Sequence, residues 1–280
     1  MDECYADLHL HTTASDGTQE ITELVGRAAA CGLSCIAITD HDTISPQLNH
    51  RTTRIGGLEV ITGVELKVDF DGIRGELLGY FIDPGKQAIN DLFQFMKRAR
   101  ETRMKEMVKR CREDLNIDIE MDEVRELAKG SLGRPHLAQL LVDKLAVSSL
   151  REAFDRHIGE GGTCYVPLKR PDFRTASAAI HNAGGITSIP HPCFMHVEDW
   201  ESFLIDVRGA GVDGIEAFYP YTKAAGRLSI TPEHLRELAK QAGFLLSGGS
   251  DDHGPGSVKE TLGSIKLPCH YVEKLRRACG

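Results

Sequence analysis

The chain has 280 residues, and its 41 Asp and Glu against 33 Lys and Arg give a formal net charge of −8 at pH 7. This excess of acid excludes a binder of duplex nucleic acid, which would need basic side chains to neutralise phosphates. No apolar stretch reaches the roughly 18 residues of a membrane span. The N-terminal segment lacks the basic start and apolar region of a secretory signal, so we expect a cytoplasmic protein.

Apolar runs with strand character alternate with helical patterns along much of the chain. In the first helical pattern Ile21, Leu24, Val25 and Ala28 form one stripe, and Gly32 follows as a cap. The alternation predicts βα units and a parallel sheet. The chain length favours closure into a single barrel, with an open sheet as the alternative. Strands are predicted at residues 5–8, 35–38, 60–62, 77–81, 186–189, 214–217 and 244–246.

One region interrupts this alternation with charged helical patterns and no strand. We predict a helical insertion over residues 84–163, placed between the barrel segments 1–83 and 164–280. Insertions at the C-terminal ends of barrel strands commonly cover an active site as a lid. Within it, residues 97–112 carry eight basic side chains. They form either a solvated helix face or a positive lid that attracts a phosphorylated substrate.

Histidine and carboxylate side chains cluster where the predicted strands end. In a parallel barrel these ends meet at one rim, and residues two apart on a strand project to the same face. Imidazole and carboxylate bind borderline or hard divalent metals without help from thiolates. The sequence therefore predicts a multinuclear metal site and favours hydrolysis. The segments are Asp7-Leu-His9-Leu-His11 with Asp16, Asp40-His41-Asp42, Glu65, Pro190-His191-Pro192 and Asp251-Asp252-His253.

The other histidines and the cysteines do not share this pattern. None of the eight cysteines forms a Cys-x-x-Cys pair, so we expect neither a disulfide framework nor zinc-finger chemistry. Cys193, two residues past His191, is interpreted as a bystander thiol. We expect six histidines at the surface: His50, His157, His181, His196, His234 and His270.

The order of the motifs, DLHLHT, SDGT, TDHD, GVE, PHP and GSDDH, resembles the polymerase-and-histidinol-phosphatase (PHP) family. The resemblance is greatest to its stand-alone phosphoesterases with a helical insertion, and it spans nearly the whole chain. It implies an α/β fold, a distorted (β/α)7 barrel, with two or three divalent metal ions. It also implies hydrolysis of phosphate esters by hydroxide that the metals activate. Mn²⁺ is the expected metal, with Fe²⁺ and Zn²⁺ as alternatives.

The resemblance also assigns metal ligands by matching position. A third metal would use Glu65 as a bridge, His191, and the residue that precedes the Leu-Leu-Gly-Tyr segment. That residue is Glu76, where the family usually has histidine, and a carboxylate would shift the preference toward harder ions. The first two metals would be held by His9, His11, Glu65 and Asp251, and by Asp16, His41 and His253.

A further match concerns substrate phosphate. The segment Gly133-Arg134-Pro135-His136 resembles the one whose arginine and histidine contact phosphate in the family, and a planar guanidinium suits two phosphate oxygens at once. Lys169 is a further candidate for a phosphate contact. Asp251 is expected to be catalytic as a metal ligand. The proton for the leaving group would come from His253, from His136 or from metal-bound water.

These features predict a hydrolase of a small phosphorylated metabolite, either a nucleotide or a ribose phosphate, as a monoester or a cyclic diester. One alternative is a 5′–3′ exonuclease or phosphatase acting on short RNA, with residues 97–112 tracking the strand. The other is an inactive barrel that serves as a structural or interaction module. Degenerate ligand positions would be expected in such a module, and only position 76 departs from the pattern.

Overall fold

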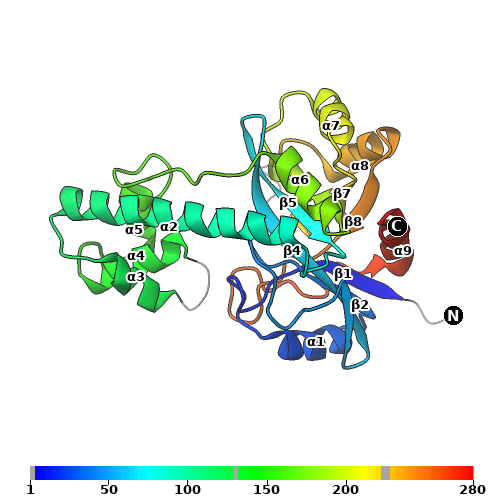
Figure 1. Ribbon diagram of the computed structural model, residues 1–280, viewed down its shortest axis with the longest axis horizontal. Coiled ribbons are helices and arrows are strands. Elements are labelled where there is room, and N and C mark those ends of the chain that lie inside the picture. Colours follow the sequence, from blue (N-terminus) through cyan, green and yellow to red (C-terminus); the bar gives the residue numbers. More distant parts are fainter. Residues whose placement is uncertain (1–3, 129–131, 222–227, 280) are drawn as a thin grey trace. The chain divides into compact units, whose positions relative to one another are not determined.

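The computed structural model describes residues 4–128, 132–221 and 228–279. Figure 1 shows the elements in chain order. The strands are β1 (Tyr5–Leu10), β2 (Cys35–Ile38), β3 (Thr52–Ile55), β4 (Leu58–Phe70), β5 (Ile73–Tyr80), β6 (Ile186–Ile189), β7 (Gly214–Phe218), β8 (Leu245–Gly248) and β9 (Leu267–Pro268). The helices are α1 (Ile21–Ala30), α2 (Gln87–Leu115), α3 (Met121–Leu127), α4 (Arg134–Asp143), α5 (Leu150–Ala153), α6 (Phe173–Asn182), α7 (Trp200–Gly209), α8 (Pro232–Gln241) and α9 (Cys269–Ala278).

The chain divides into two compact units. The barrel unit consists of Met1–Phe93 and Pro171–Gly280, and the insertion unit is Gln94–Arg170. The helix α2 begins in the barrel unit and continues into the insertion unit without a break. This division therefore differs from the bounds 84–163 that the sequence suggested. That the insertion is a domain of its own stays a prediction.

The strands form a nearly closed, distorted barrel, as the sequence predicted. Their order is β8-β7-β6-β5-β4-β2-β1-β9, and β3 pairs with β4. Beyond β8, Asp251 N donates a hydrogen bond to the carbonyl oxygen of His9 at 2.9 Å, and His11 N donates to that of Asp252 at 3.0 Å. These two bonds join the end of β1 to the segment after β8 and bring the sheet toward closure.

The barrel is not parallel throughout, which corrects the expectation of a single parallel rim. The strand β4 is 13 residues long and pairs with β5 in an antiparallel hairpin, and β5 is also antiparallel to β6. A tight hairpin connection requires antiparallel strands. The pairs β1–β2, β2–β4, β6–β7 and β7–β8 are parallel.

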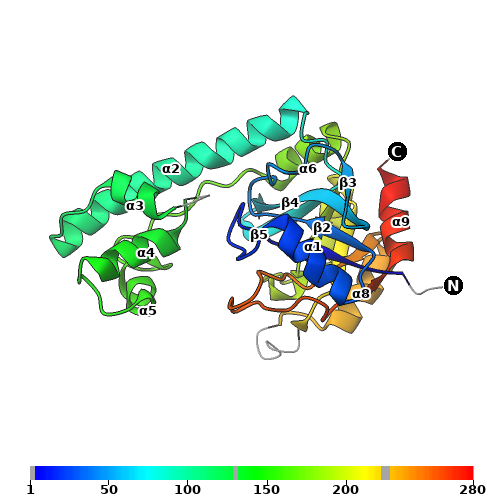
Figure 2. The ribbon, with the colours of Figure 1, turned by 90° about the horizontal axis from the view of Figure 1, so that it is seen from below.

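Helices cover the strands with the apolar stripes that the sequence predicted. The predicted stripe of α1 is buried, and α1 lies beside β1 and β2 (Figure 2). The helix α8 buries Leu235, Leu238 and Ala239. The helix α6 packs on β4, β5 and β6, with its first turn capped by Asp172, whose carboxylate accepts hydrogen bonds from the backbone of Arg174 and Thr175.

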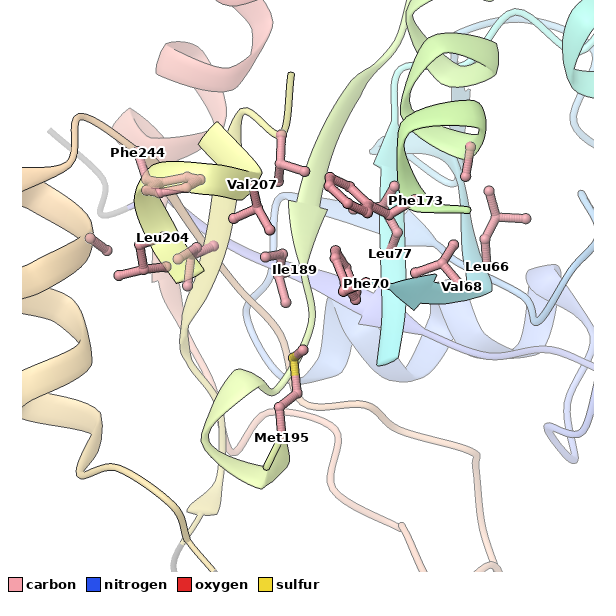
Figure 3. Packing of buried hydrophobic residues seen from close by; sticks show 14 of the residues in the cluster. Leu66, Val68, Phe70, Leu77, Phe173, Ile189, Met195, Leu204, Val207 and Phe244 are labelled. Atoms are coloured by element: carbon pink, nitrogen blue, oxygen red, sulfur yellow. The ribbon is translucent and has the colours of Figure 1, made fainter. Parts of the chain in front are cut away.

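Aromatic packing fixes the hairpin in the barrel core (Figure 3). The ring of Phe70 on β4 stacks on Phe173 of α6, with 4.9 Å between centroids, and meets Phe203 of α7 edge-on at 5.8 Å. Leu77 of β5 and Ile189 of β6 are fully buried in the same cluster. Such pairs stabilise the core beyond their buried area. They hold β4, and with it Glu65, in a fixed position.

One disulfide bond is present that cysteine spacing did not indicate. Cys4 and Cys269 are bonded, with 5.4 Å between their Cα atoms, although they are 265 residues apart in the chain. The antiparallel pairing of β1 with β9 brings them together. Spacing along the sequence could not reveal the pair, because the contact depends on this pairing.

The insertion unit has a hydrophobic core of its own. Met107 of α2, Leu137 and Leu141 of α4, and Ile158 of a π-helical turn, Phe154–Ile158, are fully buried there. The charged helical region that the sequence predicted contains α2, α3, α4, α5 and the π-helical turn. Among the described residues, no helix is both long and apolar enough to cross a membrane.

Candidate metal centre

The predicted barrel ligands meet where β1 lies against the segment after β8. Gly249 permits this approach, because a Cβ at that position would lie 2.3 Å from the Cβ of His9. The Nε2 atoms of His9 and His11 are 3.7 and 3.2 Å from Asp251 Oδ1. All three side chains are at most 1% exposed. The i, i+2 spacing of the two histidines therefore places both imidazoles beside one carboxylate.

Glu65 connects the histidines of the site. Its Oε2 atom is 3.4 Å from Nε2 of both His9 and His11 and 3.0 Å from Nδ1 of His41. Its Oε1 atom is 3.0 Å from Nε2 of His191. Contrary to the expectation of a strand end, Glu65 lies inside β4. Because its two oxygens face different imidazoles, this carboxylate can bridge two cations.

A second group forms at the more exposed side of the same cluster. The carboxylate of Asp16 is 3.4 Å from His253 Nε2, 3.8 Å from His41 Nε2 and 3.9 Å from His11 Nδ1. One ligand atom from each of these four residues lies within 4.8 Å of the others. The side chain of Asp16 is 56% exposed, so this group opens to solvent. It contains the three residues that the sequence assigned to a second metal.

Glu76 also reaches the cluster, but it has a lysine partner. Its Oε2 atom is 3.4 Å from Nε2 of His191, and its Oε1 atom is 3.9 Å from Nδ1 of His41. Across the β4–β5 pairing it faces Lys67, whose ammonium donates to Oε1 at 2.5 Å. Burial and Glu65 would raise the pKa of Glu76, but Lys67 and the histidines outweigh them and lower it to about 2. A fixed ammonium therefore already balances the carboxylate that replaces the usual histidine.

Two residues of the site have left-handed backbone conformations. The φ angles are 55° at Asp251 and 32° at His191. Such values are uncommon for residues with a side chain, and they persist where the surroundings enforce them. At His191 the backbone N–H is held by Glu216 Oε2 at 2.7 Å. The strain lies at positions that aim a side chain into the cluster.

The site contains buried polar atoms that lack partners, and these atoms test whether a metal fits. Unpaired buried polar atoms are costly and rare in native proteins. Five such atoms occur in this cluster, and all belong to imidazole or carboxylate groups, which are the donors of divalent metal sites. Within the described residues, the atoms without a hydrogen-bond partner include His9 Nε2, His11 Nδ1 and Nε2, His41 Nδ1 and Asp251 Oδ1.

The buried carboxylates of the site also favour the presence of positive charge beside them. Burial lowers the pKa of His9, but Glu216, Glu65 and Asp251 outweigh it and raise that pKa well above its usual value. Burial would raise the pKa of Asp251, yet His9 and His11 hold it well below the normal range. Without metal, the carboxylates thus draw protons onto imidazole. Divalent cations would supply the same charge and leave the histidines neutral as ligands. The buried clusters therefore fit several metal sites.

Sequence reasoning missed the residues that position the ligands. Glu216 on β7 is fully buried, and its Oε1 atom is 3.0 Å from Nδ1 of His9. The hydroxyl of Tyr219 donates to Asp251 Oδ2 at 2.9 Å, and Lys259 also donates to that oxygen. Such outer contacts orient metal-binding side chains. A glutamate in the middle of the apolar run Gly214–Phe218 was the available signal.

The predicted phosphate-binding arginine belongs to the insertion unit. The guanidinium of Arg134 lies over the rings of Phe154 and Tyr165, at 5.4 and 5.7 Å from their centroids. Arg103 lies over the same tyrosine at 5.9 Å. Burial and the charge of Arg134 lower the pKa of Arg103 to about 10. Two guanidinium groups that share one aromatic ring form a cationic cluster suited to an anion.

The other two candidates lie in the same unit. His136 is in the first turn of α4, where its Nδ1 accepts a hydrogen bond from the backbone N–H of Gly133 at 3.1 Å. The ammonium of Lys169 lies 5.8 Å from the ring of Phe95. Among the contacts of the described residues, neither His136 nor Lys169 forms an ion pair that would compete with a phosphate. Both keep their role as candidates.

The surface assignment of the remaining histidines is correct except at one position. His157 is only 9% exposed, because it lies in the π-helical turn that packs on the core of the insertion unit. Cys193 is buried and lies outside the described groups of metal-ligand side chains. The exposed histidines are His50, His181, His196, His234 and His270.

Comparison with known proteins identifies the family. Residues 7–116 match the PHP domain. The chain is 34% identical over 252 residues to a 5′-3′ exoribonuclease of Haemophilus influenzae, covering 89% of this chain and 90% of that protein. It is 30% identical over 270 residues to a 3′,5′-nucleoside bisphosphate phosphatase of Chromobacterium violaceum, covering 92% and 90%.

A solved structure agrees with these relatives. The crystal structure of a putative metal-dependent phosphoesterase from Bifidobacterium adolescentis superposes with a TM-score of 0.79 at 27% identity, covering 100% of this chain and 97% of that one. The barrel, the buried ligand groups and the relatives agree with one another. The chain therefore belongs to the PHP-domain family and is a metal-dependent phosphoesterase.

Proposed function

We propose that this enzyme hydrolyses a phosphate ester of a small nucleotide or ribose phosphate, using two to three divalent cations held in the barrel unit. Mn²⁺ is the cation we expect first, with Fe²⁺ and Zn²⁺ as alternatives. The observation that carries the proposal is the arrangement around Glu65. Its two carboxylate oxygens face four imidazoles, several of which have buried nitrogen atoms without hydrogen-bond partners.

The proposed chemistry assigns different tasks to the side chains. When bound, divalent cations activate water for attack on phosphorus and neutralise phosphate oxygens. The negative charges of Glu65 and Asp251 would stabilise those cations, and Glu216 orients the ring of His9. The leaving oxygen needs a proton, for which His253 and His136 are the candidates. His253 lies in the Asp16 group, whereas His136 is outside the buried ligand groups.

In the proposal, Arg134 and His136 bind a phosphate of the substrate, with Lys169 as an additional contact. Arg134 is preorganised for this role because two aromatic rings flank its guanidinium. A planar guanidinium can donate two parallel hydrogen bonds to phosphate oxygens. A substrate with a second phosphate would therefore gain affinity over a simple aryl phosphate.

The first experiment measures metal-dependent hydrolysis. Protein stripped by a chelator should be inactive toward an aryl phosphate and should regain activity with Mn²⁺. The Asp251→Asn variant should lose about 10³-fold in kcat/KM, because a ligand of the metal that activates the water is weakened. The matched control is Asp206→Asn on the exposed face of α7, which should keep wild-type activity. Full activity of the chelated protein without added metal would refute the proposal.

Short RNA is the second candidate substrate, and two observations favour it. One of the relatives reported above is named a 5′-3′ exoribonuclease, and α2 carries the basic segment 97–112. Binding of a 5′-phosphorylated oligonucleotide should then weaken steeply with salt. A comparison of nucleoside bisphosphates, cyclic ribose phosphates and short RNA separates the candidates.

An inactive interaction module is disfavoured, because the described barrel retains every predicted ligand position except the histidine at position 76.

A further inference from the structure

A second group of metal-ligand side chains lies in the insertion unit. Cys111 and Asp114 are one helical turn apart on α2, so their side chains project to the same side. His157 comes from the π-helical turn, and Cys164 follows it after a glycine-rich bend. Asp114, His157 and Cys164 each offer a ligand atom, and these atoms lie within 4.8 Å of one another.

Cys111 lies beside this group, although its sulfur is not among the ligand atoms that all lie within 4.8 Å of one another. Its side chain and that of Cys164 are both 0% exposed, and both cysteines are free. Burial raises the pKa of the Cys111 thiol, and a hydrogen bond with the Cys164 thiol raises it further. The two sulfur atoms are therefore neighbours. Two thiols, one imidazole and one carboxylate are a donor set typical of structural zinc.

Two of the spacings, both from Asp114, are close to those of a tetrahedral site. Asp114 Oδ2 lies 3.8 Å from His157 Nδ1 and 3.8 Å from Cys164 Sγ. Around a zinc ion with bonds of about 2.0–2.3 Å, neighbouring ligand atoms are about 3.3–3.6 Å apart. A contraction of roughly 0.3 Å would bring these two pairs to that spacing, and the Cys111 side chain would turn inward to complete the four ligands. Side-chain torsions alone can provide a shift of that size.

The local backbone holds the donors in place and leaves a route for an ion. Cys164 N donates a hydrogen bond to the carbonyl oxygen of His157 at 2.8 Å. Gly162 permits this bend, because a Cβ there would lie 2.4 Å from the same oxygen. The Thr163 hydroxyl donates to Asp114 Oδ2 at 2.6 Å and contacts His157 Nδ1 at 3.2 Å. Asp114 and Thr163 are exposed, so an ion can enter from solvent.

Two other functions for this group fit the structure less well. A Cys-His-Asp arrangement can activate a nucleophile, but a nucleophilic sulfur must be accessible and Cys164 is fully buried. A disulfide between Cys111 and Cys164 would not involve the imidazole of His157 or the carboxylate of Asp114, which lie close to Cys164. Both thiols are also reduced in the structure. A metal ion uses all four side chains at once.

We propose that Cys111, Asp114, His157 and Cys164 bind one structural divalent cation of the zinc class. The ion would fasten the bend after the π-helical turn to α2. The next residue, Tyr165, carries the ring on which Arg103 and Arg134 lie, so the ion would also fix the cationic cluster. Spacing along the sequence concealed this site, because its donors are dispersed and contain no Cys-x-x-Cys pair.

Cobalt spectroscopy of the full chain tests the proposal, because the two metal-binding regions differ in donor type. The barrel groups offer only nitrogen and oxygen, so cobalt bound there gives no sulfur-to-cobalt charge-transfer band. Reduced, metal-free protein titrated with Co²⁺ should develop this near-ultraviolet band. Cys111→Ser and Cys164→Ser should each remove about half of it, and the double variant all of it. Cys193→Ser, the control for the thiol nearest in sequence to His191, should leave it unchanged.

A substitution at the exposed ligand covers the case in which the cysteine variants do not fold. Asp114→Asn should weaken Co²⁺ binding at the sulfur site by at least about tenfold, while the circular dichroism spectrum stays that of the wild type. The proposal is overturned if reduced wild-type protein shows no band at excess Co²⁺, or if the band survives in the double cysteine variant. A Cys111–Cys164 disulfide in freshly purified protein, found by mass spectrometry of unreduced peptides, would also overturn it.

Discussion

The barrel unit and the insertion unit carry opposite charges on their candidate functional side chains. In the barrel unit, the carboxylates of Glu65, Glu216 and Asp251 are at most 1% exposed and surround histidines. In the insertion unit, the guanidinium groups of Arg103 and Arg134 share the ring of Tyr165. Buried carboxylates require cations, whereas stacked guanidinium groups favour oxyanions. This contrast is the one we expect if cations bind in the barrel unit and a substrate phosphate binds in the insertion unit, as proposed.

The two units also differ in what stabilises them. Each has its own hydrophobic core, and α2 is the element shared by both. The barrel core is large and built on β-strands, while that of the insertion unit joins short helices to α2. Small helical cores have little stability to spare. We therefore expect the insertion unit to unfold first.

The largest effect is expected from a substitution that destabilises the core of one unit and leaves the other core unchanged. Leu141→Ala in α4 removes a side chain that is 0% exposed, and such truncations cost about 3 kcal/mol. Hydrogen exchange of backbone amides should become faster in the insertion unit, while amides of the barrel strands keep their protection. Exchange measured by mass spectrometry on the native protein reports each unit separately.

Leu66→Ala in β4 is the matched control, because Leu66 is also 0% exposed but belongs to the barrel core. It should produce the reverse pattern of exchange. Equal loss of protection in both units for either variant would contradict the prediction. The insertion would then be part of one cooperative structure rather than a domain.

A smaller effect distinguishes phosphate recognition from metal chemistry. Arg134→Met keeps an unbranched, flexible side chain beside Phe154 and Tyr165 but removes the guanidinium and its charge. For a nucleoside bisphosphate we expect kcat/KM to fall on the order of 100-fold, because a bidentate contact is lost. Hydrolysis of an aryl phosphate, which has no second phosphate, should change little.

The control for this variant is Arg151→Met in the same unit. The side chain of Arg151 is 90% exposed and pairs only at the surface with Asp155, so both substrates should be turned over as by the wild type. Equal losses for the aryl phosphate and the bisphosphate in Arg134→Met would mean that Arg134 supports the fold and does not select the substrate.

Within the barrel unit, a weaker effect is expected from a residue that positions a ligand. Glu216→Gln keeps the shape of the side chain but removes the charge that fixes the ring of His9. Loss of such an outer contact typically weakens metal binding by roughly tenfold or more. Mn²⁺ affinity can be measured by isothermal titration calorimetry. Glu233→Gln, whose side chain is 73% exposed, is the control. Unchanged Mn²⁺ affinity in Glu216→Gln would contradict the role given to Glu216.

The sequence predicted those parts of the fold and site that depend on local pattern. The stripe of α1 and the i, i+2 pair His9 and His11 are legible because period and spacing act over a few residues. Contacts made by distant segments were not legible. Glu216 meets His9 only when β7 and β1 lie in one barrel, and Cys4 meets Cys269 only through the β1–β9 pairing.

The antiparallel hairpin shows a second limit. The strand runs at 60–62 and 77–81 were found, but the direction of β5 depends on the short turn between Phe70 and Ile73. A helical crossover and a hairpin turn cannot be distinguished from the strands alone. For that reason Glu65 was expected at a strand end, whereas it lies within β4.

The smallest expected effect concerns an ion pair of the barrel unit outside the metal site. His181 Nε2 lies 2.7 Å from Asp213 Oδ2, an atom that also accepts hydrogen bonds from the backbone and hydroxyl of Thr187. The hydrogen bond that His181 donates to Asp213 raises the pKa of His181 above 6.5, although burial opposes the shift. Burial would raise the pKa of Asp213. Hydrogen bonds from His181 and Thr187 outweigh this effect and lower that pKa below 3.8.

The signs of these shifts define where the pair stabilises the fold. A histidine whose folded pKa is raised stabilises fully below its unfolded pKa, near 6.5, and this contribution is lost as the pH rises through the folded pKa. The carboxylate contributes fully above its unfolded pKa, near 3.8, and less as the pH falls through the folded value. The pair therefore stabilises most between these two pH values. Because the side chain of His181 is 39% exposed, solvent screening limits the contribution to about 0.5–1 kcal/mol.

His181→Gln should therefore lower the free energy of unfolding at pH 5.5 and make almost no difference at alkaline pH. Urea denaturation of wild type and variant across this range measures the difference directly. His234→Gln at an exposed position of α8 is the control and should give a difference near zero throughout. A loss that is the same at every pH would mean that His181 acts through packing, since only the charged form of the imidazole can make stability depend on pH in this way.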